Sequence, residues 1–381
     1  MSRRTLIAVT HLLGSGHLVR ARHLAGALAR AGHAVTLASG GMPIGPPGDE
    51  PYAFVQLPPV QVEGTDFRTL LDETGAAIDD DRRERRRAML AALAASLKPD
   101  IVITEHFPFG RRQLAQEFLA LIAAARAANP AVLTLSSIRD VLVTPRPDRI
   151  AEAHARIAAH FDAVLVHGDR SFLPLEASWP VTPELRDRLR YTGYLASPSP
   201  RAERGDDGEG EFLVSGGGSG AALPVFELAL AAAGLGDSAR RWRVLAGRGL
   251  AEVDFARLQR AAPKNLVVER TRPDFAGLLA SCALSISQSG YNTVLDLVEA
   301  RRPALVIPFD AGAETEQTIR AQAMERAGLA RCLPLSGLTP ERLNAAIDAQ
   351  LLAGAPAPAA IDRDGAGALA AIIGGLRART G

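Results

Sequence analysis

The sequence predicts an α/β protein made of two Rossmann-like, parallel-sheet domains that face a central cleft. Three observations favour this fold. The 381 residues are more than one hydrophobic core usually fills. Short apolar runs alternate with longer Ala/Leu/Arg stretches of helical period. Finally, two glycine-rich turns, at 14–17 and 215–220, each follow an apolar run and precede a helical stretch.

The first half carries the elements of one such domain. Its strand candidates are short apolar or β-branched runs, at 6–9, 34–38, 53–57, 101–104, 132–135 and 164–166. The helix candidates between them span 18–31, 82–97, 111–128 and 149–160. Gly32 can adopt the left-handed cap conformation without steric cost and ends the first helix. Residues 40–48, rich in Gly and Pro, are expected to form a loop over the cleft.

A polar, almost apolar-free segment separates the halves, so we expect a first domain at 1–196 and a linker at 197–210. The second domain is expected at 211–355. Its strand candidates are 212–214, 243–245, 266–268, 284–287 and 304–308. An Ala/Gly/Pro stretch then forms another boundary. We expect the helix in the final segment, 356–381, to pack back on the first domain.

Composition excludes several classes of function. A formal net charge of +1 gives no overall attraction to nucleic acid or anionic lipid, and we expect no nucleic-acid partner. The apolar run after Arg3 and Arg4 is too short for a secretory signal and reads as a first strand. Cys282 and Cys332 have no neighbours at metal-ligand spacing, which favours buried free thiols. A cytoplasmic location is therefore expected.

The turn at 215–220 has the composition of a phosphate-binding loop. Without side chains, the amides of Gly217, Gly218 and Gly220 can approach a pyrophosphate, the following helix adds partial positive charge, and Ser219 can donate a further hydrogen bond. The spacing matches neither a Walker A loop nor a complete dinucleotide fingerprint. A tight structural turn is the alternative interpretation, and the strand-loop-helix context favours phosphate.

A longer pattern follows in the same half. Residues 287–296 read Ser-Gln-Ser-Gly-Tyr-Asn-Thr-Val-Leu-Asp, and 302–309 and Glu316-Gln317 complete it. This block resembles the C-terminal domain of MurG-type glycosyltransferases of the GT-B fold, with Asp296 in place of Glu and Glu316 in place of Gln. The first half resembles that family too, through Gly16-His17 after the first strand. The segments at 166–169 and 191–194 resemble bacterial relatives of the family.

The resemblance implies roles for individual residues in binding a nucleotide-sugar donor. The main chain at Arg272 would hydrogen-bond the uracil, and Asp296 would accept hydrogen bonds from the ribose hydroxyls, a task that suits a carboxylate. Other residues would line the phosphate or the sugar, namely Gly16, Ser289, Gly290, Asn292, Thr293, Glu316 and Gln317. A charged residue at position 316 indicates a sugar other than the family's usual one.

Each of these residues also has a structural alternative. Asn292 and Thr293 could cap the helix that begins there. Asp296 could be a solvated helix residue. The family resemblance favours the binding roles.

His17 is the main candidate for the catalytic base, because a histidine at the mouth of a strand-loop-helix turn can accept a proton near neutral pH. It could instead bind the main chain or the acceptor. Glu105-His106 and Arg139-Asp140 compete for this role because strand ends in such sheets point into the cleft. After His17, Asp140 is the next choice.

The basic run at 82–87 raises the question of membrane contact. Such a run could dock on an anionic membrane at the inner face, as peripheral enzymes with lipid acceptors do. We favour a solvated helix face, because the acidic residues at 79–81 offset much of the charge.

Together these features predict a glycosyltransferase that moves a sugar from a nucleotide diphosphate donor, most simply UDP-linked, to an acceptor hydroxyl or amine. The displacement would be inverting and would need neither a metal nor a cofactor; the acceptor is unknown. The alternatives are a nucleotide-sugar hydrolase of the same fold and a non-catalytic nucleotide-sugar-binding protein.

Overall fold

The computed structural model describes residues 2–12, 14–45, 48–64, 68–195, 207–218, 220–310 and 315–378. These residues form two compact units, which are described separately. The first unit comprises the described residues of 1–170, 174–197 and 362–381, and the second those of 171–173 and 198–361.

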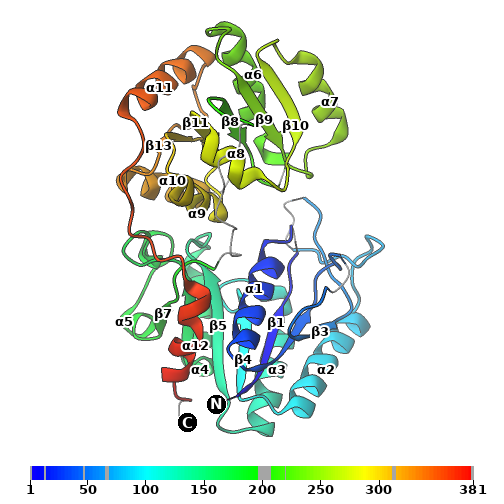
Figure 1. Cartoon of the computed structure of the whole chain (residues 1–381). Helices are drawn as coiled ribbons and strands as arrows, with labels where there is room; N and C mark the ends of the chain where they lie inside the picture. The colour runs from blue at the N-terminus through cyan, green and yellow to red at the C-terminus, as the bar shows by residue number, and fades with distance from the viewer. Residues whose placement is uncertain are drawn as a thin grey trace. The chain divides into compact units, whose positions relative to one another are not determined.

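The first unit contains a seven-stranded parallel sheet with the order β3-β2-β1-β4-β5-β6-β7 (Figure 1). Its central strands are buried and rich in Val, Ile and Leu, as expected for a sheet that is covered on both faces. The strands of the sheet span Arg4–Val9 (β1), Ala34–Ser39 (β2), Ala53–Gln56 (β3), Ile101–Glu105 (β4), Leu133–Arg139 (β5), Ala163–His167 (β6) and Leu189–Tyr191 (β7).

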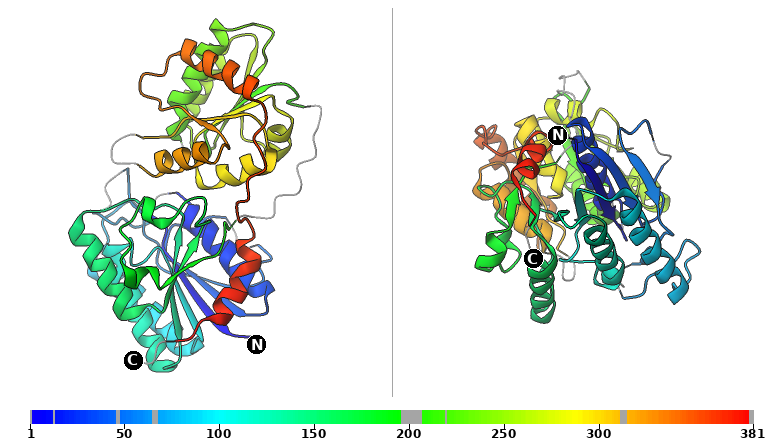
Figure 2. Two further views of the ribbon diagram at one scale, coloured as in Figure 1. Left: turned by 90° about the vertical axis from the view of Figure 1, so that its left-hand side faces the viewer. Right: turned by 90° about the horizontal axis from the view of Figure 1, so that it is seen from below.

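Helices cover both faces of this sheet. Because side chains alternate along a strand, Leu6 and Ala8 belong to one apolar cluster and Ile7 and Val9 to another. The first cluster includes side chains of α2 (Asp80–Leu97), α3 (Ala115–Ala128) and α4 (Pro147–His160). The second includes α1 (Gly16–Arg30) and α12 (Gly365–Gly375), which pack together (Figure 2). The C-terminal helix is thus part of the first unit.

The second unit contains a six-stranded parallel sheet with the order β10-β9-β8-β11-β12-β13. Its strands span Phe212–Ser215 (β8), Trp242–Ala246 (β9), Leu266–Arg270 (β10), Leu284–Ser287 (β11), Ala304–Val306 (β12) and Arg331–Cys332 (β13). One apolar core joins the sheet to α6 (Leu223–Leu235), α7 (Glu252–Ala261) and α11 (Pro340–Ala353). Three more helices complete the unit, α8 (Phe275–Ser281), α9 (Tyr291–Ala300) and α10 (Glu316–Arg326).

The structure confirms the α/β class and two parallel sheets, and it differs from the sequence predictions in detail. The sequence did not predict the edge strands β7 and β13, whose three and two residues are too few to show a periodic pattern. The basic run at 82–87 was predicted to form a solvent-exposed helix face. Arg86 contradicts this, because its side chain is fully buried in an ion pair with Glu117 at 2.7 Å.

No helix among the described residues combines the length and apolar character that a membrane crossing requires. Both cysteines are free; Cys282 is buried and Cys332 is only half-buried.

Candidate active site

The first unit has its topological switch point between β1 and β4. The chain proceeds from β1 to β2 on one side and from β4 to β5 on the other, so the loops after β1 and β4 diverge at the carboxyl edge of the sheet. Ligands of open α/β sheets bind in this kind of crevice. The loop after β1 leads to His17, and β4 ends at Glu105.

His17 and Glu105 are in direct contact across this switch point. Nδ1 of His17 lies 3.0 Å from Oε1 of Glu105. The side chain of His17 remains 16% exposed, whereas that of Glu105 is 1% exposed. Among the described residues, the hydrogen bonds of the His17 ring are made through Nδ1. The arrangement leaves Nε2 as the ring atom that can meet a substrate.

Glu105 is held by donors on both of its oxygens. Arg20 donates to Oε1 at 2.5 and 3.0 Å, and the hydroxyl of Ser137 donates to Oε2 at 2.5 Å. Burial alone would raise the pKa of Glu105, but Arg20 and Ser137 outweigh it and lower the pKa below 4.5. Glu105 is therefore ionised at neutral pH. Glu105 was a candidate base from the sequence, but this ion-paired carboxylate is a poor proton acceptor.

Cationic groups surround His17. Burial lowers its pKa well below 6.5, and the positive charges of Arg111, Arg20 and Arg139 lower the pKa further. His106, the other candidate at this strand end, places its ring 4.8 Å from that of His17, and burial lowers its pKa as well. Both imidazoles are thus neutral at pH 7, the form that can accept a proton.

Asp140, the second choice for the base, is placed unfavourably for that role. Its side chain is fully buried. Oδ2 accepts a hydrogen bond from the hydroxyl of Tyr194 at 3.0 Å, and Oδ1 accepts one from the amide of Val141 at 2.9 Å. The carboxylate therefore anchors the chain after β5 and does not face a substrate, which leaves His17 as our candidate.

The second unit repeats the arrangement, with its switch point between β8 and β11. The glycine loop follows β8, and Ser289-Gly290 follows β11. Gln288 links the two loops. Its main-chain N–H donates to Ser215 O at 3.4 Å, and its side-chain amide donates to Ala221 O at 3.3 Å. The predicted phosphate residues of both loops are therefore neighbours.

The glycines of the loop after β8 serve different purposes. A Cβ on Gly216 would lie 1.9 Å from Cβ of Ala222, so this glycine allows the chain to pack against the start of the next helix. Gly217 has a φ of +66°, which favours glycine. Gly218 has open space within 4 Å of its Cβ position and is exposed. Gly218 is thus where a ligand can approach the main chain. Ser219 lies outside the described residues.

A third glycine-flanked turn, at 247–249 after β9, supports this loop and was missed by the sequence analysis. The amide of Gly249 donates to Gly218 O at 3.0 Å, and a Cβ on Gly247 would lie 2.1 Å from Gly217 O. Between them, Arg248 is exposed and makes no ion pair with the described residues. The signal that could have revealed it is a Gly-Arg-Gly sequence directly after a predicted strand.

The helix α9 begins at the second loop without a side-chain cap. Its N-cap residue is Gly290. The capping role considered for Asn292 and Thr293 is therefore not what the structure shows. A helix N-terminus without a side-chain cap offers its amides and partial positive charge to an anion. Ser289 is fully buried instead, with its hydroxyl donating to Gln317 O at 2.7 Å.

Asp296, on the second turn of α9, is half-buried, and its carboxylate makes no hydrogen bond to any described residue. Burial raises its pKa to about 6. This carboxylate therefore has the capacity to accept hydrogen bonds from a ligand, in agreement with the ribose role that the family resemblance implies.

The other residues predicted to bind the nucleotide sugar interact with neighbouring residues of the second unit. The Arg272 side chain binds Asp274 at 2.5 Å, and its carbonyl accepts from Phe275 at 3.3 Å. Glu316 is buried and pairs with Arg320 at 2.9 Å. The side chain of Gln317 accepts from the amide of Phe309 at 3.0 Å. Since Arg320 neutralises Glu316, the charge at this position is not evidence for an unusual sugar.

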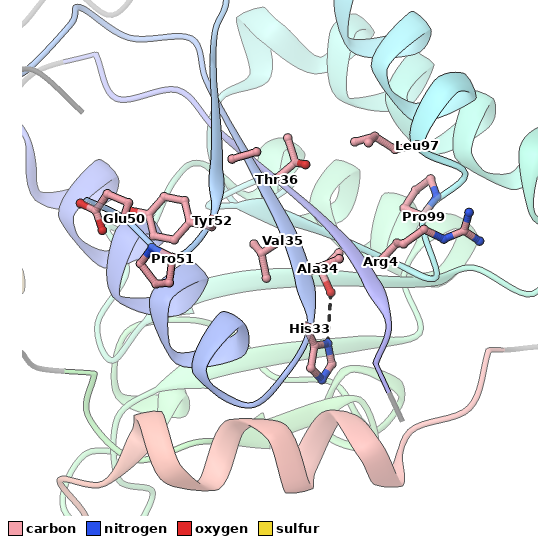
Figure 3. A pocket seen from close by; sticks show the side chains of 12 residues that line it. Arg4, His33, Ala34, Val35, Thr36, Glu50, Pro51, Tyr52, Leu97 and Pro99 are labelled. Atoms are coloured by element: carbon pink, nitrogen blue, oxygen red, sulfur yellow. Dashed lines mark hydrogen bonds between the residues drawn. The ribbon is translucent and has the colours of Figure 1, made fainter. Parts of the chain in front are cut away.

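A pocket of the first unit lies away from His17, at the other edge of the sheet. This shallow pocket of about 530 Å³ is lined by the first residues of β1, β2 and β3, with His33 and Tyr52 (Figure 3). It lies at the amino edge of the sheet, opposite the edge that carries His17. No group of three or more His, Cys, Asp or Glu side chains among the described residues is arranged to hold a metal ion.

The second unit matches a known family of glycosyltransferase domains. Residues 213–363 match the glycosyltransferase family 28 C-terminal domain. The chain is 30% identical over 211 residues to the UDP-N-acetylglucosamine--N-acetylmuramyl-(pentapeptide) pyrophosphoryl-undecaprenol N-acetylglucosamine transferase of Mesorhizobium japonicum, covering 52% of this chain and 53% of the relative. The transferase of the same name from Cronobacter sakazakii is 33% identical over 143 residues, covering 37% and 40%. The chain thus matches about half the length of these relatives or less.

Solved structures agree on the fold. MurG of Acinetobacter baumannii has a TM-score of 0.57 at 18% identity, covering 91% of this chain and 90% of its own. The calicheamicin glycosyltransferase CalG4 has a TM-score of 0.57 at 17% identity, covering 92% and 90%. At such low identity these likenesses show the fold alone, which is GT-B. Together with the match of residues 213–363 to the family 28 domain and the similarity to the two transferases, the fold supports a place for this chain among the MurG-like GT-B glycosyltransferases.

Proposed function

We propose that the protein is a glycosyltransferase that moves a sugar from a nucleotide diphosphate donor, UDP-linked, to an acceptor hydroxyl or amine. The observation that carries the proposal is the 3.0 Å contact between His17 Nδ1 and Glu105 at the switch point of the first unit. A second set of groups, at the switch point of the second unit, suits a diphosphate and a ribose. The relatives named above are UDP-N-acetylglucosamine transferases, which supports a UDP-linked donor.

In the proposed mechanism, His17 is the general base. Ionised Glu105 can only accept a hydrogen bond, so it favours the tautomer with the proton on Nδ1. Nε2 then has a lone pair and takes the proton of the acceptor hydroxyl or amine. As that proton leaves, the acceptor atom attacks the anomeric carbon and the bond to the diphosphate breaks. A single displacement of this kind inverts the anomeric centre.

The second unit is proposed to bind the donor and to stabilise the leaving diphosphate. Negative charge develops on the leaving diphosphate. It would be stabilised by the exposed main chain of Gly218, the uncapped N-terminus of α9 and the guanidinium of Arg248. Asp296 would accept hydrogen bonds from the ribose hydroxyls. These groups act as fixed donors and charges, so the proposed reaction assigns no step to a metal ion.

Mass spectrometry of the reaction products tests the proposal. The protein is incubated with UDP-N-acetylglucosamine, with and without the lipid-linked muramyl pentapeptide on which the named relatives act. Transfer predicts UDP together with an acceptor that has gained the mass of the sugar. Free sugar formed equally well without acceptor would indicate the hydrolase, and donor binding without turnover would indicate a binding protein.

Two alanine substitutions in the glycine loop separate binding from folding. Gly218→Ala adds a methyl group in open space, so we expect stability within about 0.5 kcal/mol of wild type, whereas donor binding weakens roughly tenfold or more because the methyl blocks approach to the amide. Gly216→Ala is expected to destabilise by about 1–3 kcal/mol through its clash with Ala222. Calorimetric titration and thermal unfolding measure the two effects. Unchanged affinity in Gly218→Ala would argue against a phosphate at this loop.

The proposed ribose contact predicts a pH dependence. Because the folded-state pKa of Asp296 is raised to about 6, the carboxylate protonates as the pH falls through 6, and donor affinity is expected to weaken below that pH. Asp296→Asn should lose roughly 10- to 100-fold in affinity and lose this pH dependence. Titrations from pH 5 to pH 8 measure both, and equal affinities in the two proteins would contradict the contact.

The raised pKa of Asp296 predicts that stability depends on pH in the opposite direction to donor affinity. The folded protein holds the Asp296 proton more tightly than the unfolded chain, so this group makes ligand-free stability fall as the pH rises from 3.8 to about 6. At pH 7.5, Asp296→Asn is therefore expected to melt no lower than wild type.

A further inference from the structure

Two segments of the first unit play no part in the mechanism above, namely 166–169 and 191–194. His167 ends β6, and Thr192 directly follows β7. Both side chains are fully buried. His167 Nδ1 lies 2.8 Å from the hydroxyl of Thr192, and Nε2 lies 3.0 Å from the hydroxyl of Ser137. Because Ser137 in turn lies 2.5 Å from Oε2 of Glu105, a chain of contacts runs across the sheet edge to the carboxylate beside His17.

Donor and acceptor chemistry sets the direction of the contacts between Glu105 and His167. Ionised Glu105 can only accept, so the single proton of the Ser137 hydroxyl points to it. Ser137 Oγ must then accept from His167, which requires the proton on Nε2. A neutral imidazole has one N–H, so Nδ1 of His167 carries the lone pair that faces the hydroxyl of Thr192. That hydroxyl also lies 2.8 Å from Gly193 O and 3.4 Å from Val166 O, which compete for its proton. Burial lowers the pKa of His167 to about 3, which keeps the ring neutral.

The orientation of Glu105 matters because Arg20 competes for His17. Nη2 of Arg20 lies 3.0 Å from His17 Nδ1, the same distance at which Oε1 of Glu105 lies. If Glu105 turned away, Nδ1 would accept from Arg20, and the ring proton would move to Nε2. That is the atom which has to be free to take the proton of the acceptor.

We propose that His167 and Ser137 are positioning residues, which fix the Glu105 carboxylate and thereby keep the proton of His17 on Nδ1. The catalytic meaning of this arrangement rests on the proposed function, whereas the hydrogen-bond pattern does not. Ser137 occupies Oε2, so that Oε1 stays directed at His17 and Arg20. His167 holds the hydroxyl of Ser137 in the rotamer that donates to Glu105. The relay consists of His167, Ser137 and Glu105.

Nuclear magnetic resonance of the full chain with 15N-labelled histidine tests the proposal, because ring nitrogen shifts report the tautomer. In wild type at pH 7.5, we expect His17 protonated on Nδ1 and His167 protonated on Nε2. Ser137→Ala and His167→Leu should move the His17 proton wholly or partly to Nε2. His167→Gln offers a donor to Ser137 and an acceptor to Thr192, so it should restore the wild-type His17 signals.

His33→Gln is the matched control. His33 contacts the hydroxyl of Thr5 at 3.3 Å, a pair of the same kind at the opposite edge of the sheet, and its replacement should leave the His17 signals unchanged. Unaltered His17 signals in Ser137→Ala would overturn the proposal, as would His167 protonated on Nδ1. Ser137→Ala also provides the test if His167→Leu does not fold.

A kinetic measurement then separates positioning from general stability. With transfer measured, Ser137→Ala is expected to lower kcat about tenfold with little change in the donor KM, as for other residues that orient a catalytic group. The loss should vanish when Glu105→Gln is already present, since both changes remove the same restraint. Equal losses in the presence and absence of Glu105→Gln would contradict the relay. The resonance experiment tests the hydrogen-bond relay even if no sugar transfer is found. Failure of the relay and failure of the proposed transferase function can therefore be distinguished.

Discussion

Replacement of His17 by Ala is expected to reduce kcat/KM for sugar transfer by roughly 100- to 10,000-fold, the contribution of a well-placed general base. Donor affinity should change little, because the donor groups proposed here belong to the second unit. In wild type, the acid limb of the kcat/KM profile should lie below pH 6.5, since the pKa of His17 is lowered. Release of nucleoside diphosphate in the presence of acceptor, and calorimetric titration of the donor, measure the two quantities.

The matched control for this variant is His106→Ala, at the neighbouring strand end. The His106 ring lies beside His17 but makes no hydrogen bond to Glu105 among the described residues, so its replacement should lower kcat/KM far less than that of His17. A His17→Ala protein that retains transfer within a few-fold of wild type would exclude His17 as the base. A His106→Ala protein that loses more activity would assign the role to His106.

Replacement of Arg86 by Met is expected to destabilise the first unit by about 3–5 kcal/mol, the usual cost of leaving a buried ionic partner unpaired. The Arg86 guanidinium pairs with Glu117 at 2.7 and 2.8 Å and also donates to Gly40 O, Pro58 O and the hydroxyl of Thr10. These groups lie in the segments that follow β2, β3 and β1. Arg86 therefore also holds the loops at the carboxyl edge of the sheet, near His17.

Thermal unfolding followed by circular dichroism measures this cost. Arg87→Met is the control on the same helix, because Arg87 forms an exposed pair with Glu84, and such pairs contribute no more than about 1 kcal/mol. Arg86→Met combined with Glu117→Leu should recover part of the loss, since no unpaired charge stays buried. Equal melting temperatures for Arg86→Met and Arg87→Met would show that the buried pair does not stabilise the unit.

The fold was predictable from sequence because alternating strand and helix patterns are local. The positions of His17 and of the loop after β8 were predictable for the same reason, as each follows a strand and opens a helix. The partnership of His17 with Glu105 was not, since the two residues are 88 positions apart and meet only because β1 lies next to β4. For this reason the sequence offered Glu105 as a rival to His17 and not as its partner.

Other features were hidden in charge patterns. Arg86 lies four residues before Leu90, on the core-facing side of the helix, and helical spacing could have predicted its burial. Glu316 lies four residues before Arg320, so their ion pair was also visible in principle. By contrast, nothing local indicates that the side chain of Asp296 is left without a partner, because this depends on how α9 packs in the second unit.

Isothermal titration of the protein with a panel of UDP-, dTDP- and GDP-linked sugars is the most direct test of a donor site at the switch point of the second unit. We predict saturable binding of one equivalent of a nucleotide sugar, weakened by Gly218→Ala and Asp296→Asn and retained by His17→Ala. Absence of binding for every compound, or binding that none of these substitutions in the second unit affects, would contradict it.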